Sequence, residues 1–339
     1  MQIVSNTEGR GLAAILGATL VSPGPELDGI VQKRDFLDSE ETVIFAGTGF
    51  GETASTISSR RPVFGASIWT DKVNAYPDRM FELAAIAGMR FPKFHVTVSG
   101  DEALSGAYEQ VSTRVYIRKE GGIRLSVEAF FAEGSFKSFF AKYHGDRILY
   151  NNEGPKVGCS TSLVFSQPNT VLRKYFDRIA PIISLEAPEY RGPVTIEARV
   201  SGTDVCCHSI RFGYDFDFEF AKVFLCGKEI LTGKVRSLPT GFGSTIRLCD
   251  IRRDGFDVGA LDSKYCVPTG VRKADDGRAV SCAETIAVCV GIGDTIKNSF
   301  TNCLEVVRKV KTPDMCYRPD GGGAALHWWK EAQKEGILK

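Results

Sequence analysis

The fold is decided first by a short apolar run, TVIFAG at residues 42–47, which ends in a glycine. A run of β-branched and aromatic residues before a turn predicts a strand that is buried on both faces. Working outward, Ile3-Val4 before the glycine-containing turn NTEGRG predicts a similar strand followed by a helix, and PVFG at residues 62–65 predicts a third strand. Strands that alternate with helices favour a parallel sheet, so we expect the chain to begin with an α/β domain.

The segments that follow mix helices and strand pairs. PDRMFELAAIAG at residues 77–88 has a proline near its start and a glycine at its end, which indicates a helix. Glycines and short polar turns between apolar runs predict hairpins. The further elements we expect are a hairpin of residues 114–119 and 125–131 around Glu120-Gly121-Gly122, a strand pair of residues 194–200 and 209–213, a strand at 286–290 and an amphipathic helix at 294–310.

Length and composition are those of a folded protein of two or three domains. The chain has 339 residues, of which 43% are hydrophobic, and its 42 basic and 41 acidic residues give a formal net charge of +1. Such a balance provides no overall attraction for nucleic acid or for an anionic membrane. The N-terminus has neither the basic flank nor the apolar run of a signal peptide, so we expect a cytoplasmic protein without a membrane partner.

The ten cysteines are scattered between Cys159 and Cys316. In a large chain without a secretory signal, this distribution favours reduced thiols over a disulfide framework. The run Cys206-Cys207-His208 could suggest zinc, but neighbouring residues of a strand point to opposite faces and no Cys-x-x-Cys accompanies it. We therefore interpret these three as buried structural residues.

A series of short motifs is informative when taken in chain order. The motifs are VFGAS (63–67), DR (78–79), AGMRFP (87–92), GPKVG (154–158), IRFG (210–213), VGIGDTI (290–296) and MCYRPD (315–320). This series resembles the glycinamide ribonucleotide synthetase family of the ATP-grasp superfamily, in which VFGPS, GPNTGG, VRFGD, AVGDT and MYYRKD recur in the same order. The resemblance begins at Gly9-Arg10 and extends to Gly323.

The resemblance implies an ATP-grasp-like α/β fold in which one part is reduced. It divides the chain into an N-terminal αβ domain (1–70), a linking helix (71–92), a reduced ATP-grasp lobe (93–150), a central ATP-grasp sheet (151–235) and a C-terminal domain (236–339).

The family joins a carboxylate, glycine, to the amine of phosphoribosylamine through an acyl phosphate made with ATP. Such chemistry needs Mg²⁺ and cationic groups around the transferred phosphoryl. The resemblance implies Arg211 as a catalytic residue. It implies ATP contacts at Arg79, Arg118, Lys119, Glu128 and Phe130, and substrate contacts at Gly9, Arg10, Gly154, Pro155, Gly158, Gly291, Gly293, Asp294 and Arg318. Strand alternation allows only one of Arg118 and Lys119 to face the cleft.

Three departures from the family pattern bear on activity. The segment after Lys119 reaches VEAFF at residues 127–131 so soon that the glycine-rich loop that covers the phosphates is missing. Cys207 and Ser209 stand where the family has a glutamate and an asparagine, which removes oxygen ligands that Mg²⁺ prefers. These losses weaken the expectation of ATP and Mg²⁺ binding.

A compensating metal site is one interpretation of DFDFEF at residues 215–220. On a strand, Asp215, Asp217 and Glu219 would share one face, and Asp215 and Asp217 are the candidate Mg²⁺ ligands. The alternative is an ordinary half-buried strand with a solvated acidic face. Likewise, turn geometry can account for the glycines near Gly9, and helix capping for Asp294.

Two functions therefore remain open from the sequence. One is a divergent carboxylate–amine ligase that uses ATP, with an amino acid and a nucleotide-like amine as small-molecule substrates. The other is a catalytically inactive ATP-grasp scaffold or ligand-binding protein, which would be compatible with a viral origin. The sequence does not decide between them, and it leaves the oligomeric state open.

Overall fold

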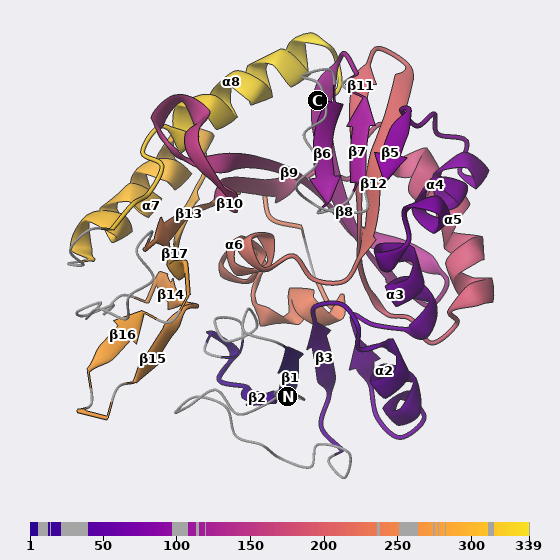
Figure 1. The fold of residues 1–339 in the computed structure, drawn as a ribbon, viewed down its shortest axis with the longest axis horizontal. Coiled ribbons are helices and arrows are strands. Elements are labelled where there is room, and N and C mark those ends of the chain that lie inside the picture. The colour runs from indigo at the N-terminus through magenta and orange to yellow at the C-terminus, as the bar shows by residue number, and fades with distance from the viewer. Residues whose placement is uncertain are drawn as a thin grey trace.

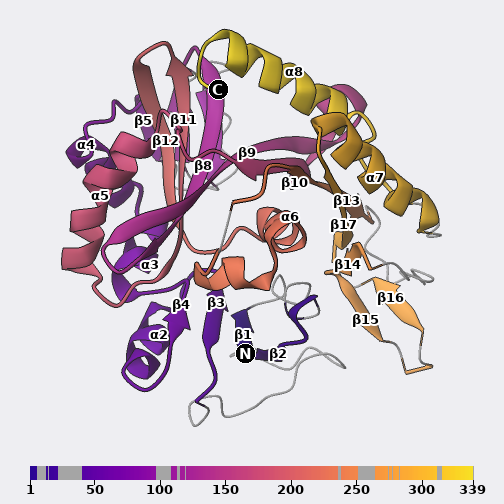
Figure 2. The ribbon, with the colours of Figure 1, turned by 180° about the vertical axis from the view of Figure 1, so that it is seen from behind.

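The computed structural model describes residues 1–5, 13, 15–21, 40–96, 108–112, 115–118, 120–235, 238–250, 264–273, 275–276, 278–281, 283–310 and 315–338. Within these residues it contains a parallel sheet, a small antiparallel sheet, a large antiparallel sheet and a two-stranded ribbon, with helices around them (Figures 1 and 2).

The N-terminal sheet is parallel, as predicted. It consists of β1 (Gln2–Ser5), β2 (Thr19–Val21), β3 (Val43–Ala46) and β4 (Val63–Phe64) in the order β2-β1-β3-β4. Every residue of β1 and β3 is buried, which is why their sequences are continuous apolar runs and do not alternate. The helix expected after β1 falls largely outside the described residues.

Helix α2 (Gly51–Ser58) joins β3 to β4, and α3 (Ile68–Ala75) and α4 (Pro77–Ile86) connect this sheet to the rest of the chain. Ser67 caps α3 by accepting a hydrogen bond from the backbone N–H of Thr70 at 3.1 Å. The predicted helix after Pro77 is confirmed, with proline in its first turn. Asp71 of α3 accepts the backbone N–H groups of Gly49 and Gly51, so its carboxylate already occupies the N-terminus of α2.

A small sheet follows, and it contradicts the first predicted hairpin. It contains β5 (Phe94–Val96), β6 (Tyr108–Ser112) and β7 (Val115–Arg118) in the order β5-β7-β6. Strand β8 (Ile123–Ala132) belongs to a different sheet, so β7 and β8 do not pair as a hairpin. The hairpin instead joins β8 to β9 (Ser135–Leu149) through Glu133 and Gly134, both at positive φ (53° and 74°), as a tight two-residue turn requires.

The large sheet has eight strands in the order β12-β11-β8-β9-β10-β13-β17-β14, and each neighbouring pair is antiparallel. It draws strands from residues 123 to 293, so the predicted divisions at 150 and 235 separate segments of one sheet. The predicted β11–β12 pair and the strand near 286–290 are confirmed. The remaining strands are β10 (Glu153–Ser166), β11 (Gly192–Ser201), β12 (Asp204–Phe212), β13 (Phe242–Cys249), β14 (Cys266–Pro268) and β17 (Thr285–Gly293).

Helices cover this sheet on both sides. Helices α5 (Arg173–Glu186), α7 (Ile296–Lys309) and α8 (Gly321–Lys334) pack in one hydrophobic core against one face, and α6 (Phe216–Cys226) packs against the other (Figures 1 and 2). The predicted helix at 294–310 is confirmed as α7, which Thr295 caps by accepting the N–H of Asn298. Shorter elements are the 3₁₀ turns η2 (Tyr150–Asn152) and η3 (Lys228–Thr232) and the ribbon of β15 (Val271–Lys273) and β16 (Ala279–Ser281).

The strand predicted at residues 215–220 is wrong, because this segment begins helix α6 (Phe216–Cys226). Residues 217–223 are all buried, so the helix shows no polar face and its Asp-Phe alternation resembles a strand pattern. Asp217 and Glu219 lie in its first turn, where acidic side chains interact favourably with the helix dipole. Helix α6 lies at the centre of the molecule in both views, between the N-terminal sheet and the large sheet (Figures 1 and 2).

Among the described residues, no helix is both long and apolar enough to cross a membrane.

Candidate functional site

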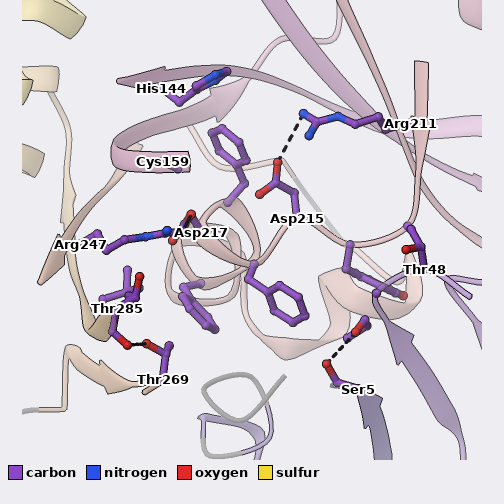
Figure 3. A pocket seen from close by; sticks show the side chains of 18 of the residues that line it. Ser5, Thr48, His144, Cys159, Arg211, Asp215, Asp217, Arg247, Thr269 and Thr285 are labelled. Carbon is purple, nitrogen blue, oxygen red and sulfur yellow. Dashed lines mark hydrogen bonds and ion pairs between the residues drawn. The ribbon is translucent and has the colours of Figure 1, made fainter. Parts of the chain in front are cut away.

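The candidate site is a cavity of about 810 Å³ around the start of α6 (Figure 3). Its floor is formed by the carboxyl ends of β1 and β3, at Ser5 and Ala46, which is where open α/β sheets place their ligands. The large sheet forms the opposite wall with His144, Thr195 and Arg211. Its other lining residues include Thr48, Cys159, Asp215, Asp217, Arg247, Thr269, Glu284 and Thr285.

Arg211 projects into this cavity near the end of β12. Its side chain is 51% exposed, and its nearest carboxylates are those of Asp215 at 3.8 Å and Glu197 at 4.0 Å. No hydrogen bond joins its guanidinium to the part of the chain that the structure describes. Arg211 therefore retains most of its donors for another partner.

Arg247 is held quite differently on the other side of α6. Its guanidinium donates to the backbone carbonyl of Val157 and to the carboxylate of Asp217, which is almost fully buried. Although burial alone would lower it, the nearby Asp217 carboxylate raises the pKa of Arg247. Burial raises the pKa of Asp217, and the ion pair counteracts that rise. The Arg247–Asp217 ion pair is therefore a structural part of the cavity wall.

Cys159 lies in the same region of the cavity. Burial, together with the nearby Asp217 carboxylate, raises the pKa of its thiol well above the ordinary value. A thiol held in its protonated form is a poor nucleophile, so this cysteine does not indicate covalent catalysis.

The structure brings the two predicted metal ligands, Asp215 and Asp217, to the cavity that also contains Arg211. Each, however, faces an arginine, and the carboxylate of Asp217 is bonded to Arg247. Across the described ranges, no three His, Cys, Asp or Glu side chains come together in a way that could hold a metal ion. The Asp217 carboxylate thus does not fit Mg²⁺, since the guanidinium of Arg247 already occupies the place of a cation.

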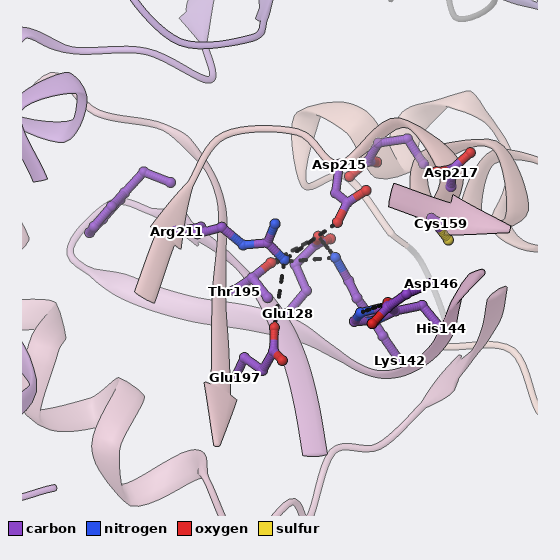
Figure 4. A network of polar contacts seen from close by, with 12 residues as sticks. Glu128, Lys142, His144, Asp146, Cys159, Thr195, Glu197, Arg211, Asp215 and Asp217 are labelled. Atoms are coloured by element: carbon purple, nitrogen blue, oxygen red, sulfur yellow. Dashed lines mark hydrogen bonds and ion pairs between the residues drawn. The ribbon is translucent and has the colours of Figure 1, made fainter. Parts of the chain in front are cut away.

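Glu128, the predicted ATP contact on β8, is 2% exposed and belongs to a buried ionic group (Figure 4). Its carboxylate accepts hydrogen bonds from Lys142 on β9 and Lys222 on α6, and Lys222 also donates to Glu219 at 2.7 Å. We call Glu128, Lys142, Lys222 and Glu219 the buried lysine cluster. Burial alone would raise the pKa of Glu128, but the two ammonium groups lower it to about 2.

The burial and pairing of these lysines were not predicted from the sequence. No local motif marks Lys142 or Lys222 as buried, and Glu128 and Lys222 are separated by 94 positions. The only available signal was the placement of each lysine within an otherwise apolar segment, FFAKY and FAKVF.

A second polar group lies on the same sheet near Arg211 (Figure 4). Glu197 accepts a hydrogen bond from Arg124, which also pairs with Asp146 at 3.5 Å, and His144 contacts Asp146 at 3.2 Å. Burial opposes ionisation of Glu197, but the surrounding cations lower its pKa to about 2. These residues keep the wall beside Arg211 charged and ordered.

Two other predicted ATP contacts, Phe130 and Arg79, do not line the cavity. Phe130 is buried against Phe64, with ring centroids 6.2 Å apart, and Arg79 is exposed on α4, where it pairs with Glu82 at 3.2 Å. Arg118 ends β7, while Lys119 lies outside the described residues. The question of which of these two faces the cleft stays a prediction.

Only some of the predicted substrate contacts fall within the described residues. Gly9 and Arg10 lie outside the described residues, and Gly154, Pro155 and Gly158 lie on β10. Gly291 and Gly293 of β17 lie against α7, where an added Cβ atom would collide with the backbone around Ser299, so close packing accounts for both glycines.

Asp294 and Arg318 also have structural partners. Asp294 is exposed and accepts a hydrogen bond from the side chain of Asn298 at 2.7 Å. Arg318 is 3% exposed and pairs with Asp320 at 3.1 Å. Neither residue lines the cavity described above.

No family model and no curated protein sequence matches this chain. Solved structures do match. Phosphoribosylamine–glycine ligase from Thermotoga maritima superposes with a TM-score of 0.70 at 18% identity, over 94% of this chain and 100% of that one. An L-amino acid ligase from Bacillus licheniformis gives 0.53 at 11% identity, over 93% and 97%. N5-carboxyaminoimidazole ribonucleotide synthetase from Thermus thermophilus gives 0.52 at 15% identity, over 92% and 99%. The chain therefore has an ATP-grasp-like α/β fold, as predicted.

Proposed function

We propose that this protein binds a small metabolite with an acidic and a basic group, amino-acid-like or nucleotide-like, in the cavity around α6. On this proposal the ATP-grasp-like fold serves as a binding scaffold and does not carry out ATP-dependent ligation. The observation that carries the proposal is a pair of opposite charges at the cavity. Arg211 is half exposed, and its guanidinium makes no hydrogen bond to the described residues. Its Nη2 atom lies 3.8 Å from Oδ2 of Asp215.

The arrangement of charge supports this class of ligand. An acidic group of the ligand can take the guanidinium donors of Arg211 in two parallel hydrogen bonds. A basic group can then take the Asp215 carboxylate, which lies next to Arg211 and is 27% exposed. Hydroxyl groups of Ser5, Thr48 and Thr195 provide further polar contacts around the same space.

The loss of ligation is supported by the connection between β7 and β8. Only residues 119–122 lie between these strands, which leaves no room there for a loop that covers the phosphates of ATP. Glu128 is enclosed by two lysines, and Asp217 is bonded to Arg247. Those groups would have to give up strong buried contacts before they could hold a nucleotide or its metal ion.

Isothermal titration calorimetry on the purified protein tests the proposal. The probes are the standard L-amino acids, ribose 5-phosphate and the 5′-nucleotides, each measured with Mg²⁺ and with a chelator. We expect at least one to bind with a dissociation constant that Mg²⁺ does not change. Arg211→Ala should weaken this binding by about 10-fold or more, because it removes hydrogen bonds to a charged group of the ligand. Arg173→Ala, an exposed arginine on α5, is the matched control and should leave the constant unchanged.

A second candidate is a divergent ATP-dependent carboxylate–amine ligase. It is favoured by one observation, that Asp215, Asp217 and Arg211 share a cavity, because Mg²⁺ is often held by one or two carboxylates together with the phosphates of its nucleotide. ADP release with amino acids and nucleotide amines tests this candidate. Turnover that requires Mg²⁺ and is abolished by Asp215→Asn would establish the ligase and overturn the binding proposal.

A further inference from the structure

Two pairs of cysteines face each other across antiparallel backbone in this protein, and their geometries differ. All nine cysteines in the described part of the chain are free thiols. Cys266 on β14 lies opposite Cys289 on β17, at the edge of the large sheet. Cys249 at the end of β13 lies opposite Cys316 in an isolated bridge.

The backbone hydrogen bonds distinguish the two pairs. Cys249 and Cys316 exchange both backbone hydrogen bonds, each 2.9 Å long, so they form a hydrogen-bonded pair. Between β14 and β17 the bonds instead join the flanking positions, with the Val290 N–H donating to the Tyr265 carbonyl and the Thr269 N–H to the Ile286 carbonyl. Cys266 and Cys289 therefore form a non-hydrogen-bonded pair, in which Cα atoms approach to about 4.5 Å and side chains lie closer than in the other kind.

The sulfur atoms follow this backbone geometry. The Sγ atoms of Cys266 and Cys289 lie 3.9 Å apart, and the thiol of Cys289 donates to the sulfur of Cys266. A Cα separation of about 4.5 Å is within the range that a disulfide accepts, so little backbone movement is needed. The thiol hydrogen bond lowers the pKa of Cys266, which favours the nucleophilic thiolate at that position. Cys303, another buried thiol beside this pair, donates instead to the carbonyl of Cys289 at 3.2 Å.

We propose that Cys266 and Cys289 form a reversible cross-strand disulfide on exposure to a peroxide. The Cys266 thiolate attacks hydrogen peroxide to give a sulfenic acid and, after protonation, water. The Cys289 thiol then attacks the sulfenic sulfur and releases a second water molecule, so that two thiols are oxidised and one peroxide is reduced. A dithiol reductant reverses the step.

The consequence concerns the wall of the cavity. Thr269 follows Cys266 on the same edge, Val288 precedes Cys289, and both line the cavity together with Thr285. The hydroxyl of Thr269 already donates to the carbonyl of Thr285 at 3.4 Å (Figure 3). A disulfide would fix this edge and couple the rigidity of the wall to the redox state of the solution.

Peptide mapping after peroxide treatment, with free thiols alkylated before digestion by trypsin, tests the proposal. Cleavage yields peptides 265–272, 279–297, 248–252 and 312–330, which separate Cys266, Cys289, Cys249 and Cys316. We expect a cross-link between 265–272 and 279–297 with the loss of two hydrogens, and alkylated thiols at Cys249 and Cys316. Because peptide 279–297 also contains Cys282, the mapping is repeated with Cys282→Ser, which should retain the cross-link.

Variants make the result decisive. Cys289→Ser and Cys266→Ser should each abolish the cross-link, and Cys303→Ser should retain it. If solvent exposure alone decided which pair is oxidised first, Cys249 and Cys316 would react before Cys266 and Cys289. Cys316 is half-buried, whereas Cys266 and Cys289 are 5% and 0% exposed. A first disulfide between Cys249 and Cys316, or oxidation to sulfinic acid without any cross-link in a protein that stays folded by circular dichroism, would overturn the proposal. The mapping does not depend on the ligand, so its outcome is independent of the proposed binding function.

Discussion

The two groups of charge on either side of α6 serve opposite purposes. In the buried lysine cluster every charged side chain is at most 4% exposed, and each charge is bonded to an opposite one. At the cavity, Arg211 is 51% exposed and its carboxylates stay 3.8 Å or more away. Charges that are sealed and paired stabilise a particular packing, whereas a charge left without close partners at a cavity is available to a ligand.

The largest expected effect comes from breaking the buried lysine cluster. Glu128→Ala leaves Lys142 and Lys222 buried without their shared counter-charge, so we expect a loss of about 3–5 kcal/mol in the free energy of unfolding. Urea denaturation followed by circular dichroism measures it. The control is Glu82→Ala, whose carboxylate pairs with an arginine at the exposed surface and which should change stability by about 0.5 kcal/mol or less. Equal effects of the two substitutions would contradict the assignment.

The pH dependence of stability sharpens the comparison within the same cluster. Burial and the nearby Glu128 raise the pKa of Glu219 from 4.5 to about 7. A carboxyl with a raised pKa holds its proton more tightly in the folded state, so its contribution is complete below pH 4.5 and is lost as the pH rises to 7. Glu219→Gln cannot ionise and should remove this loss.

The expected difference between wild type and Glu219→Gln is about 3 kcal/mol over that interval, from about 1.4 kcal/mol per pKa unit. Unfolding in urea at a series of pH values between about 4 and 8 measures it. Subtracting the free energies of unfolding of the two proteins at each pH removes the contribution of all other titrating groups. Parallel stability curves for the two proteins would show that Glu219 is not the group responsible.

A smaller effect is expected at the second arginine of the cavity. Arg247→Ala leaves Asp217 buried without its partner, and since Arg247 is still 20% exposed we expect a loss of about 2 kcal/mol. Combining it with Asp217→Asn should restore part of that loss, because no charge then remains buried. A double variant that is no more stable than Arg247→Ala would mean that the guanidinium acts through packing alone.

How far the sequence predicted the fold depends on how local the signal was. The buried strands β1, β3 and β4 were predicted because each is a short continuous apolar run next to a turn. Helix α6 was missed because it is buried around its whole circumference, which removes the helical period, and its alternating Asp and Phe residues imitate a strand. The hairpin predicted between residues 114–119 and 125–131 was wrong, because a tight glycine turn does not reveal that its two flanking strands join different sheets.

Some residues of the candidate site carry a local signal. The resemblance implied Arg211 as a catalytic residue, and the alternation of DFDFEF suggested Asp215 and Asp217 as metal ligands; all three line one cavity, and their roles stay predictions. Arg247 neutralises Asp217, and Lys142 and Lys222 neutralise Glu128; these three cations come from two strands and a helix far apart in the chain. No local pattern encodes such partners, since they are selected by the packing of α6 against the large sheet.

The smallest effect on stability, and the sharpest test of the comparison, is expected at Arg211. Its ion pairs are long and exposed to solvent, so Arg211→Ala should change the free energy of unfolding by about 0.5 kcal/mol or less.

A bound ligand raises the unfolding temperature in proportion to the logarithm of its concentration over its dissociation constant. With a ligand found by calorimetry, wild type should therefore be stabilised while Arg211→Ala, equally stable alone, should gain much less at the same concentration. Asp215→Ala should behave in the same way if a basic group of the ligand takes that carboxylate. If Arg211→Ala instead lowers the free energy of unfolding by several kcal/mol without ligand, the guanidinium has a structural role like the charges of the buried lysine cluster. The distinction between the two groups of charge would then fail.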